Sequence, residues 1–342
     1  MFRYIFIIKL LFVFFASILS TTVFAEKDIY ILNSHYKTSQ TMFNLSDGSN
    51  YNTWAMKGSW TDNFSNFGSV NCVGQAQRSK IKDLSKDKNS YIVKTDKGTI
   101  SSPSIVIASG GLSIPKIGAT DFGYQIAKQF NLKVTELTPA LVPLVFEKDI
   151  LDFCKSLAGT SLNASIKINK TVFKEGLIFT HRGLSGPSIL QISSYWVKGS
   201  PIKINLLPDQ DIEVILKNRR ISTPKQIVSK ILSDYLPNKL SLAICDQLKV
   251  KKQIGDTSNQ ILKKVSNFVN NWTVVPSGTE GYKTAEVTLG GIDTKEISSS
   301  TMECKKHPGL YFVGEVLDVT GHLGGHNFQW AWSSGFLAGQ YV

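Results

Sequence analysis

Four absences limit what this sequence can encode. It has four cysteines in 342 residues and no C-x-x-C pair, which argues against a zinc site and against a dense disulfide framework. It has no arginine-rich stripe, no recognisable RNA- or DNA-binding motif and no G-x-G-x-x-G string. We expect the cysteines to be buried thiols, or to form one or two disulfides in an exported protein. They are Cys72, Cys154, Cys245 and Cys304.

Charged residues are also few, at 19%, and positive ones dominate, giving a formal net charge of +12. Hydrophobic residues make up 42%, enough to bury a core, so a disordered chain is not expected. The lysines are scattered along the chain. We interpret them as a solvated basic surface that favours anionic ligands. No metal and no nucleic acid partner is expected, and the substrate of an active enzyme would be a small molecule.

The first 25 residues form a segment of their own. They carry positive charge at Arg3 and Lys9, continue with an apolar run over residues 10–19, and end in the small residue Ala25. This pattern is typical of a secretory signal peptide. An uncleaved anchor and a buried element of the main fold are the alternatives, and membrane contact is expected only through this segment. Residues 26–75 show no assignable pattern.

Strand patterns begin near residue 90. Residues 91–95 alternate apolar and polar side chains, and residues 96–98 (DKG) are typical of a hairpin turn. Residues 104–108 form a nearly continuous apolar run, as in a buried strand. The run ends in Gly110 and Gly111, which allow the backbone to approach a ligand closely. A simple tight turn is the alternative.

Helical spacing of apolar residues marks three further segments. Residues 122–130 follow a possible capping residue, Thr120. Thr223, followed by proline, is expected to cap a helix that runs to residue 232. Residues 261–269 are expected to form another helix with one apolar face.

Glycine-rich loops with ionisable side chains supply candidate site residues. His181 and Arg182 lie in such a loop and suit an anionic or carbonyl substrate, although a structural turn would have the same composition. Residues 281–291 end in a glycine pair and are either ligand-facing or a plain strand and turn. The candidate catalytic groups are His181, Arg182 and His322. Each histidine also has a purely structural interpretation.

The C-terminal stretch is the richest in such signals. A buried strand ends in Gly314 and Glu315, and an acid at this place accepts hydrogen bonds from sugar hydroxyls. A helix expected over residues 329–340 follows a glycine-rich loop. Free N–H groups at a helix N-terminus suit an anion or an electron-rich carbonyl. The loop residues in question are Gly324, Gly325, His326 and Asn327.

Four ordered strings together resemble the BaiN-like, aminoacetone-oxidase-type family of FAD-dependent oxidoreductases. They are residues 108–116 (ASGGLSIPK), 180–187 (THRGLSGP), 279–291 (TEGYKTAEVTLGG) and 314–332, which begins GE and ends in tryptophan. They span about two thirds of the chain.

The resemblance implies an α/β fold, with a doubly wound FAD-binding domain over residues 76–138 and 276–342. It implies an inserted domain over residues 139–275, first a β-barrel with strands near 164–168 and 202–206, then helices. By the same resemblance, FAD is the cofactor, and Gly110, Gly111, Gly314 and Gly324 lie near it. Glu315 would bind the ribityl or phosphate region. Gly325, His326 and Asn327 would face the flavin ring.

The departure from the family pattern concerns the pyrophosphate-binding loop. Relatives begin with a strand, G-x-G-x-x-G and a helix, whereas this sequence has no such unit. The FAD-binding domain is therefore expected to be incomplete and N-terminally truncated, and the oxidoreductase to be impaired. The alternatives are a non-catalytic remnant or chimera of a flavoprotein, and an exported anionic-ligand-binding protein. The signal-like segment favours export, whereas the family resemblance favours the cytoplasm.

Overall fold

A computed structural model describes residues 53–55, 75–77 and 81–342. They fall into two compact units, each described by itself. Unit 1 comprises the described residues up to Thr138 together with Thr288–Val342, and unit 2 comprises Pro139–Val287. The predicted signal peptide lies outside the described residues. Among the described helices, none is long and apolar enough to cross a membrane.

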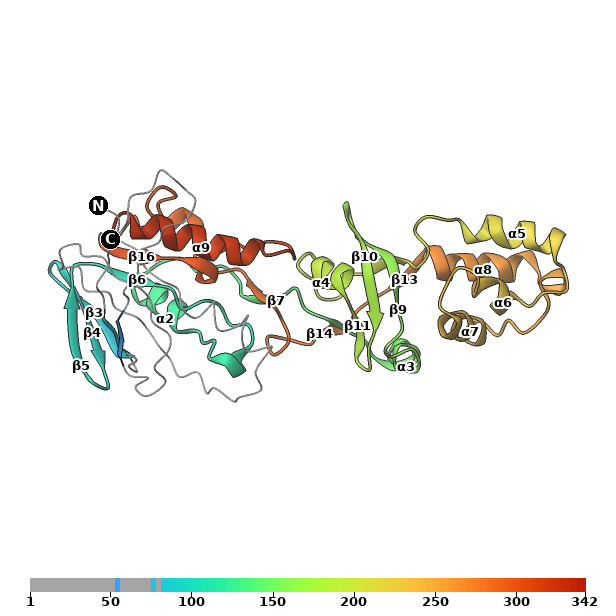
Figure 1. Ribbon diagram of the computed structural model, residues 1–342, viewed down its shortest axis with the longest axis horizontal. Coiled ribbons are helices and arrows are strands. Elements are labelled where there is room, and N and C mark those ends of the chain that lie inside the picture. Colours follow the sequence, from blue (N-terminus) through green and yellow to red (C-terminus); the bar gives the residue numbers. More distant parts are fainter. Residues whose placement is uncertain (1–52, 56–74, 78–80) are drawn as a thin grey trace. The chain divides into compact units, whose positions relative to one another are not determined.

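Unit 1 is built around two parallel strands, with helices α2 and α9 on opposite sides of the pair (Figure 1). The predicted apolar run becomes strand β6, so that prediction is confirmed. Gly123 lets helix α2 approach the pair closely, since a Cβ there would lie 3.4 Å from Ile107 Cγ2 of β6. This is a mixed α/β arrangement. The elements are β6 (Ile105–Ile107), β16 (Leu310–Phe312), α2 (Phe122–Gln129) and α9 (His326–Gly339).

A separate three-stranded antiparallel sheet, in the order β3-β4-β5, also belongs to unit 1. The predicted hairpin at residues 96–98 is confirmed, because it joins β4 to β5. Leu84, Tyr91 and Val93 are buried and belong to the same apolar cluster as β6 and β16. The strands are β3 (Ile81–Asp87), β4 (Ser90–Thr95) and β5 (Gly98–Ser102), and a further pair is β1 (Thr53–Ala55) with β2 (Gln75–Gln77).

The chain passes between the two units within β7 (Thr138–Ala140) and at β15 (Val287–Leu289). Three short 3₁₀ turns complete unit 1. They are η1 (Pro115–Ile117), η3 (Thr294–Glu296) and η4 (Gly314–Val316).

Unit 2 contains a seven-stranded sheet in the order β13-β12-β9-β10-β11-β8-β14. The prediction of a β-barrel is not supported, because β13 and β14 end the order at opposite edges and the sheet does not close. Helices α3, α4 and α8 pack against these strands, so the apolar face is buried without closure. The strands are β8 (Leu144–Val145), β9 (Ser161–Ile168), β10 (Thr171–Phe179), β11 (Gly183–Ser185), β12 (Ile202–Asn205), β13 (Trp272–Val274) and β14 (Gly278–Thr279).

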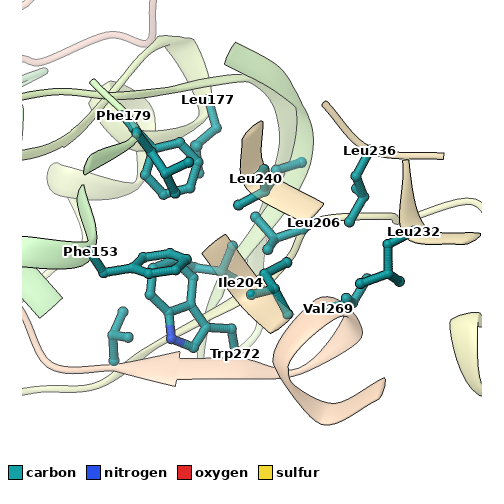
Figure 2. Packing of buried hydrophobic residues seen from close by; sticks show 14 of the residues in the cluster. Phe153, Leu177, Phe179, Ile204, Leu206, Leu232, Leu236, Leu240, Val269 and Trp272 are labelled. Atoms are coloured by element: carbon teal, nitrogen blue, oxygen red, sulfur yellow. The ribbon is translucent and has the colours of Figure 1, made fainter. Parts of the chain in front are cut away.

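Aromatic and aliphatic side chains from the strands and helices form the core of unit 2 (Figure 2). The indole of Trp272 stacks on Phe268 at 5.1 Å between ring centroids and meets the edge of Phe153 at 5.6 Å. Leu232, Leu236 and Leu240 extend the same core among the helices (Figure 2). The helices are α3 (Lys148–Ser156), α4 (Pro187–Ser193), α5 (Ile212–Ser222), α6 (Val228–Leu232), α7 (Asn238–Gln247) and α8 (Asn259–Asn270), with the 3₁₀ turn η2 (Ile254–Asp256).

Two predicted helix starts are wrong. Thr223 ends α5 rather than capping a new helix, since its N–H donates to the carbonyl of Arg219 at 2.8 Å. The next helix starts only at Val228, because the carbonyl of Pro224 is already engaged by the N–H of Gly255 at 2.9 Å. Helix α2 is preceded by Asp121 instead of Thr120, with no side-chain cap.

The cysteines of the described residues are free and buried: Cys154, Cys245 and Cys304. Burial raises the pKa of the Cys154 and Cys245 thiols to about 12, so both remain protonated at neutral pH. Cys72 lies outside the described residues.

Candidate functional site

The parallel pairing of β6 and β16 brings two predicted glycine motifs to one edge of unit 1. Phe312 lies opposite Ile107, so the carboxyl ends of the strands coincide. Gly110 and Gly111 follow one strand, and Gly314 and Glu315 follow the other. In open α/β sheets, this edge is where ligands bind.

The side chain of Glu315 is the centre of this edge. Its Oε1 accepts a hydrogen bond of 2.6 Å from the backbone N–H of Thr288. A Cβ on Gly111 would lie 2.5 Å from the same oxygen. Burial raises the pKa of the Glu315 carboxyl above its ordinary value of 4.5, although hydrogen bonds from Thr288 and the Gly111 backbone oppose this shift. Glycine is therefore required at position 111 by the space that the carboxyl occupies.

Thr288 ties the glycine loop to this acid, and it has no assigned role in the sequence prediction. Its Oγ1 accepts the N–H of Leu112 at 2.8 Å and lies 3.3 Å from Ser113 Oγ. The residue is buried. In the sequence, only its position two residues before the glycine pair 290–291 marks Thr288. One threonine thus joins three segments that are distant in sequence.

Helix α9 binds both backbone polar groups of Gly314, its N–H and its carbonyl. Its N–H donates to Ser334 Oγ at 3.0 Å, and its carbonyl accepts the indole N–H of Trp330 at 3.1 Å. Its φ of 75° lies in the left-handed region that favours glycine. Ser334 and Trp330 are further site residues without a sequence signal, and they fix the end of β16 against the helix.

The N-terminus of α9 carries no side-chain cap. Gly325 precedes it with φ 88°, and a Cβ there would meet no atom within 4 Å. The first turn of a helix has N–H groups without an intrahelical partner, and the macrodipole makes this end positive. These N–H groups suit an anion or an electron-rich carbonyl, and their predicted contact with a flavin ring stays a prediction.

Asn327 uses its side chain within the loop. Its Oδ1 accepts the N–H of Gly321 at 2.8 Å, and its Nδ2 donates to the Gly321 carbonyl at 3.1 Å. It therefore holds the loop that precedes α9. His322 and His326 are exposed at this end. Their predicted contacts with a cofactor or substrate stay predictions.

His181 and Arg182 belong to unit 2, whereas the edge described above belongs to unit 1. Both are exposed in a turn in which Thr180 Oγ1 accepts the N–H of Gly183 at 3.1 Å. Arg182 Nη1 lies 3.7 Å from Glu280 Oε2. Their catalytic role also stays a prediction. In the described part of the chain, no cluster of His, Cys, Asp and Glu could hold a metal ion.

A family model described as the Rossmann domain of HI0933-like proteins matches residues 54–341. The chain belongs to this family. The resemblance to oxidoreductases with a Rossmann-type domain is therefore confirmed at the family level.

Proteins with named activities match about three quarters of the chain. The chain is 47% identical over 269 residues to a ribosomal RNA dihydrouridine synthase of Escherichia coli (strain K12), covering 77% of this chain and 66% of the relative. It is 42% identical to a protein of the same name from Haemophilus influenzae, with 76% and 66% covered. A 3-dehydro-bile acid delta(4,6)-reductase of Clostridium scindens is 25% identical, with 76% and 67% covered. The chain thus spans about two thirds of the length of these relatives.

Proposed function

We propose that this protein is a flavin-dependent reductase that hydrogenates the ring double bond of uridine in ribosomal RNA. The observation that carries the proposal is the 47% identity to a dihydrouridine synthase across both units of the fold. Hydrogenation adds one hydride and one proton to the uracil ring. The reducing equivalents would come from a nicotinamide nucleotide, the usual two-electron donor for flavoenzymes.

The edge of unit 1 fits an FAD cofactor in three respects. The glycine pair Gly110–Gly111 allows close backbone approach. Glu315 is a partly buried acceptor at the strand end, and the uncapped N-terminus of α9 suits the electron-rich carbonyl of a flavin ring. When bound, FAD supplies the hydride. The residues of this edge would hold and orient the flavin ring.

RNA as substrate departs from the expectation that no nucleic acid is bound. Two relatives are ribosomal RNA dihydrouridine synthases, which conflicts with that expectation in part. A net charge of +12 suits a polyanionic substrate, because lysines that neutralise phosphates release counterions. The reductase of 25% identity favours a second candidate, reduction of a small unsaturated molecule by the same site.

The missing G-x-G-x-x-G string supports a weaker hold on FAD than in a complete site. With weakened FAD binding, the protein would be either an impaired enzyme or a non-catalytic remnant of a flavoprotein. The prediction of export from the signal-like residues 1–25 stays a prediction, as does the cytoplasmic alternative.

The test has two steps with the purified full chain. The first is the visible absorption spectrum after gel filtration, with and without added FAD. The second is incubation with reduced nicotinamide nucleotide and deproteinised ribosomal RNA, followed by mass spectrometry of nucleosides. A retained flavin band and new dihydrouridine are expected. A folded chain that retains no flavin would support the remnant. A flavoprotein that oxidises the nucleotide without forming dihydrouridine would support a small-molecule substrate.

A further inference from the structure

Unit 2 carries most of the protein's positive charge. Residues 139–287 contain 20 Lys and Arg against 12 Asp and Glu, a net charge of +8 out of the total of +12. The remaining residues contain 18 against 14, a net charge of +4. An anionic partner would therefore be attracted mainly to unit 2.

Strand pairing gathers part of this charge on the solvent face of the sheet. Lys167 of β9 lies directly opposite Lys203 of β12, and both side chains are exposed. Their neighbours Ile166 and Ile204 point into the core. Along the same row, Thr273 of β13 lies next to Lys203. We call the outward-facing residues of β9, β10, β12 and β13 the lysine face.

No carboxylate stands on the lysine face within these four strands. On β9, Ser165 is the outward residue next to Lys167 and Asn163 the one after it, and both can hydrogen-bond without adding charge. On the other side, Lys167 lies opposite the exposed Val172 of β10. Lys174 of β10 is also exposed but is paired with Asp209. Among residues 81–342, neither Lys167 nor Lys203 takes part in an ion pair.

Two more lysines lie at the same end of the sheet. Lys170 is in the tight turn that follows β9, and Lys198 is in the turn that precedes β12; both are exposed. Because β9 and β12 are antiparallel, the end of one strand adjoins the start of the other. Besides the opposed pair Lys167 and Lys203, the turns at this end of β9 and β12 therefore carry two more exposed lysines.

A directly opposed pair of like charges destabilises an antiparallel sheet, so this arrangement has a cost for folding. A phosphate between the two ammonium groups would remove that repulsion. We propose that the lysine face binds the phosphate backbone of the RNA substrate, with Lys167 and Lys203 as its central contacts. This inference rests on the proposed function for the choice of RNA. The uncharged Asn163 and Ser165 suit ribose hydroxyls and base edges.

The test compares two double variants of the full chain. Lys167→Gln/Lys203→Gln removes the central contacts. Lys230→Gln/Lys239→Gln, on α6 and α7, removes the same charge from exposed lysines away from the face. The probe is deproteinised ribosomal RNA, and Kd is measured between about 50 and 200 mM salt. The first variant should weaken binding roughly tenfold and lower the salt slope by about 2, and the second should change Kd by less than about twofold.

A third variant separates binding from folding. Lys203→Glu replaces the repulsion with an attraction, so it should raise Tm while weakening RNA binding further than Lys203→Gln. Equal effects of the two double variants on Kd would overturn the proposal, as would no effect of the first. Loss of binding to vesicles of anionic phospholipid, with RNA binding unchanged, would assign the face to a membrane instead.

The outcomes also separate this inference from the proposed function. A wild-type chain that does not bind RNA overturns both. A chain that binds RNA through the lysine face but forms no dihydrouridine leaves the face in place and removes the proposed reaction. If the first double variant binds RNA with unchanged Kd and still forms dihydrouridine, the proposed reaction stands and the lysine face is not the RNA-binding surface.

Discussion

At the scale of single residues, glycine is needed at the neighbouring positions 110 and 111 for two different reasons. Gly110 has a φ of 71° and open space where a side chain would be, so alanine there would cost only the left-handed conformation. Gly111 has no such φ, but a Cβ would lie 2.5 Å from both Glu315 Oε1 and Thr288 Oγ1. Glycine is favoured at position 110 by its backbone conformation and at position 111 by the lack of space for a side chain.

Gly111→Ala should therefore destabilise unit 1 by about 1–3 kcal/mol through overpacking, and it should reduce flavin retention. Gly110→Ala should cost about 1–2 kcal/mol through its backbone alone and leave Glu315 in place. Chemical denaturation gives the stabilities, and absorption after gel filtration gives retained flavin. Equal flavin loss in both variants would contradict the assigned role of the Glu315–Gly111 contact.

Glu315 gives a prediction for pH. A carboxyl whose pKa is higher in the folded protein than in the unfolded chain binds its proton more tightly when folded. The free energy of unfolding should then fall as pH rises above 4.5, the ordinary value, through the raised folded value. Glu315→Gln keeps an acceptor for the Thr288 N–H but does not titrate. The variant should gain stability relative to the wild type as pH rises through this window, measured as the difference in Tm. A constant difference would mean that burial does not shift this group.

The sequence revealed some of these residues and not others. The positions of Gly110, Gly111 and Glu315 at the carboxyl ends of two strands are predictable because each follows an apolar run, whereas their contact with a cofactor stays a prediction. Thr288 and Ser334 were not found, because a buried hydroxyl has no sequence pattern. Their partners are 176 and 20 residues away in the chain. Lys167 and Lys203 looked like scattered charge until the strand register placed them opposite each other.

At the scale of elements, the aromatic contacts of β13 hold the sheet of unit 2 against α3 and α8. Trp272→Ala should destabilise unit 2 by about 3–5 kcal/mol, because the indole is buried against Phe153 and Phe268. Trp332→Ala on α9, where the side chain is 56% exposed, is the matched control and should change stability by less than about 0.5 kcal/mol. Thermal unfolding followed by circular dichroism measures both. Similar losses in the two variants would show that this cluster is not the stabilising contact.

Elements with a strong local period were predictable, and those decided by tertiary contacts were not. The apolar face of residues 261–269 gave α8, and the short alternating runs gave β9 and β12. The local pattern at Thr223 and Pro224 favoured a helix start, but a distant hydrogen bond from Gly255 holds that segment in another conformation. Whether a sheet closes depends on its two edge strands, and β14 is only two residues long.

At the scale of the whole molecule, unit 2 is one continuous stretch with its own core. Residues 139–287 expressed alone should therefore unfold cooperatively, with the circular dichroism of a mixed α/β domain. Because the lysine face lies wholly within this stretch, the fragment should also bind ribosomal RNA once its folding has been shown. A fragment that is unfolded under native conditions would show that unit 2 depends on the rest of the chain.

Unit 1, by contrast, is assembled from two stretches that are separated by all of unit 2. Strand β6 leaves the ribosome about 200 residues before its partner β16. At about 5–20 residues per second, this is a wait of about 10–40 s. During that time the apolar strand lacks β16, its parallel neighbour among the described residues, while unit 2 has been synthesised in full. Chaperone dependence in the cell should therefore follow the delay between the two halves of unit 1, and a slower ribosome should lower the yield of folded protein.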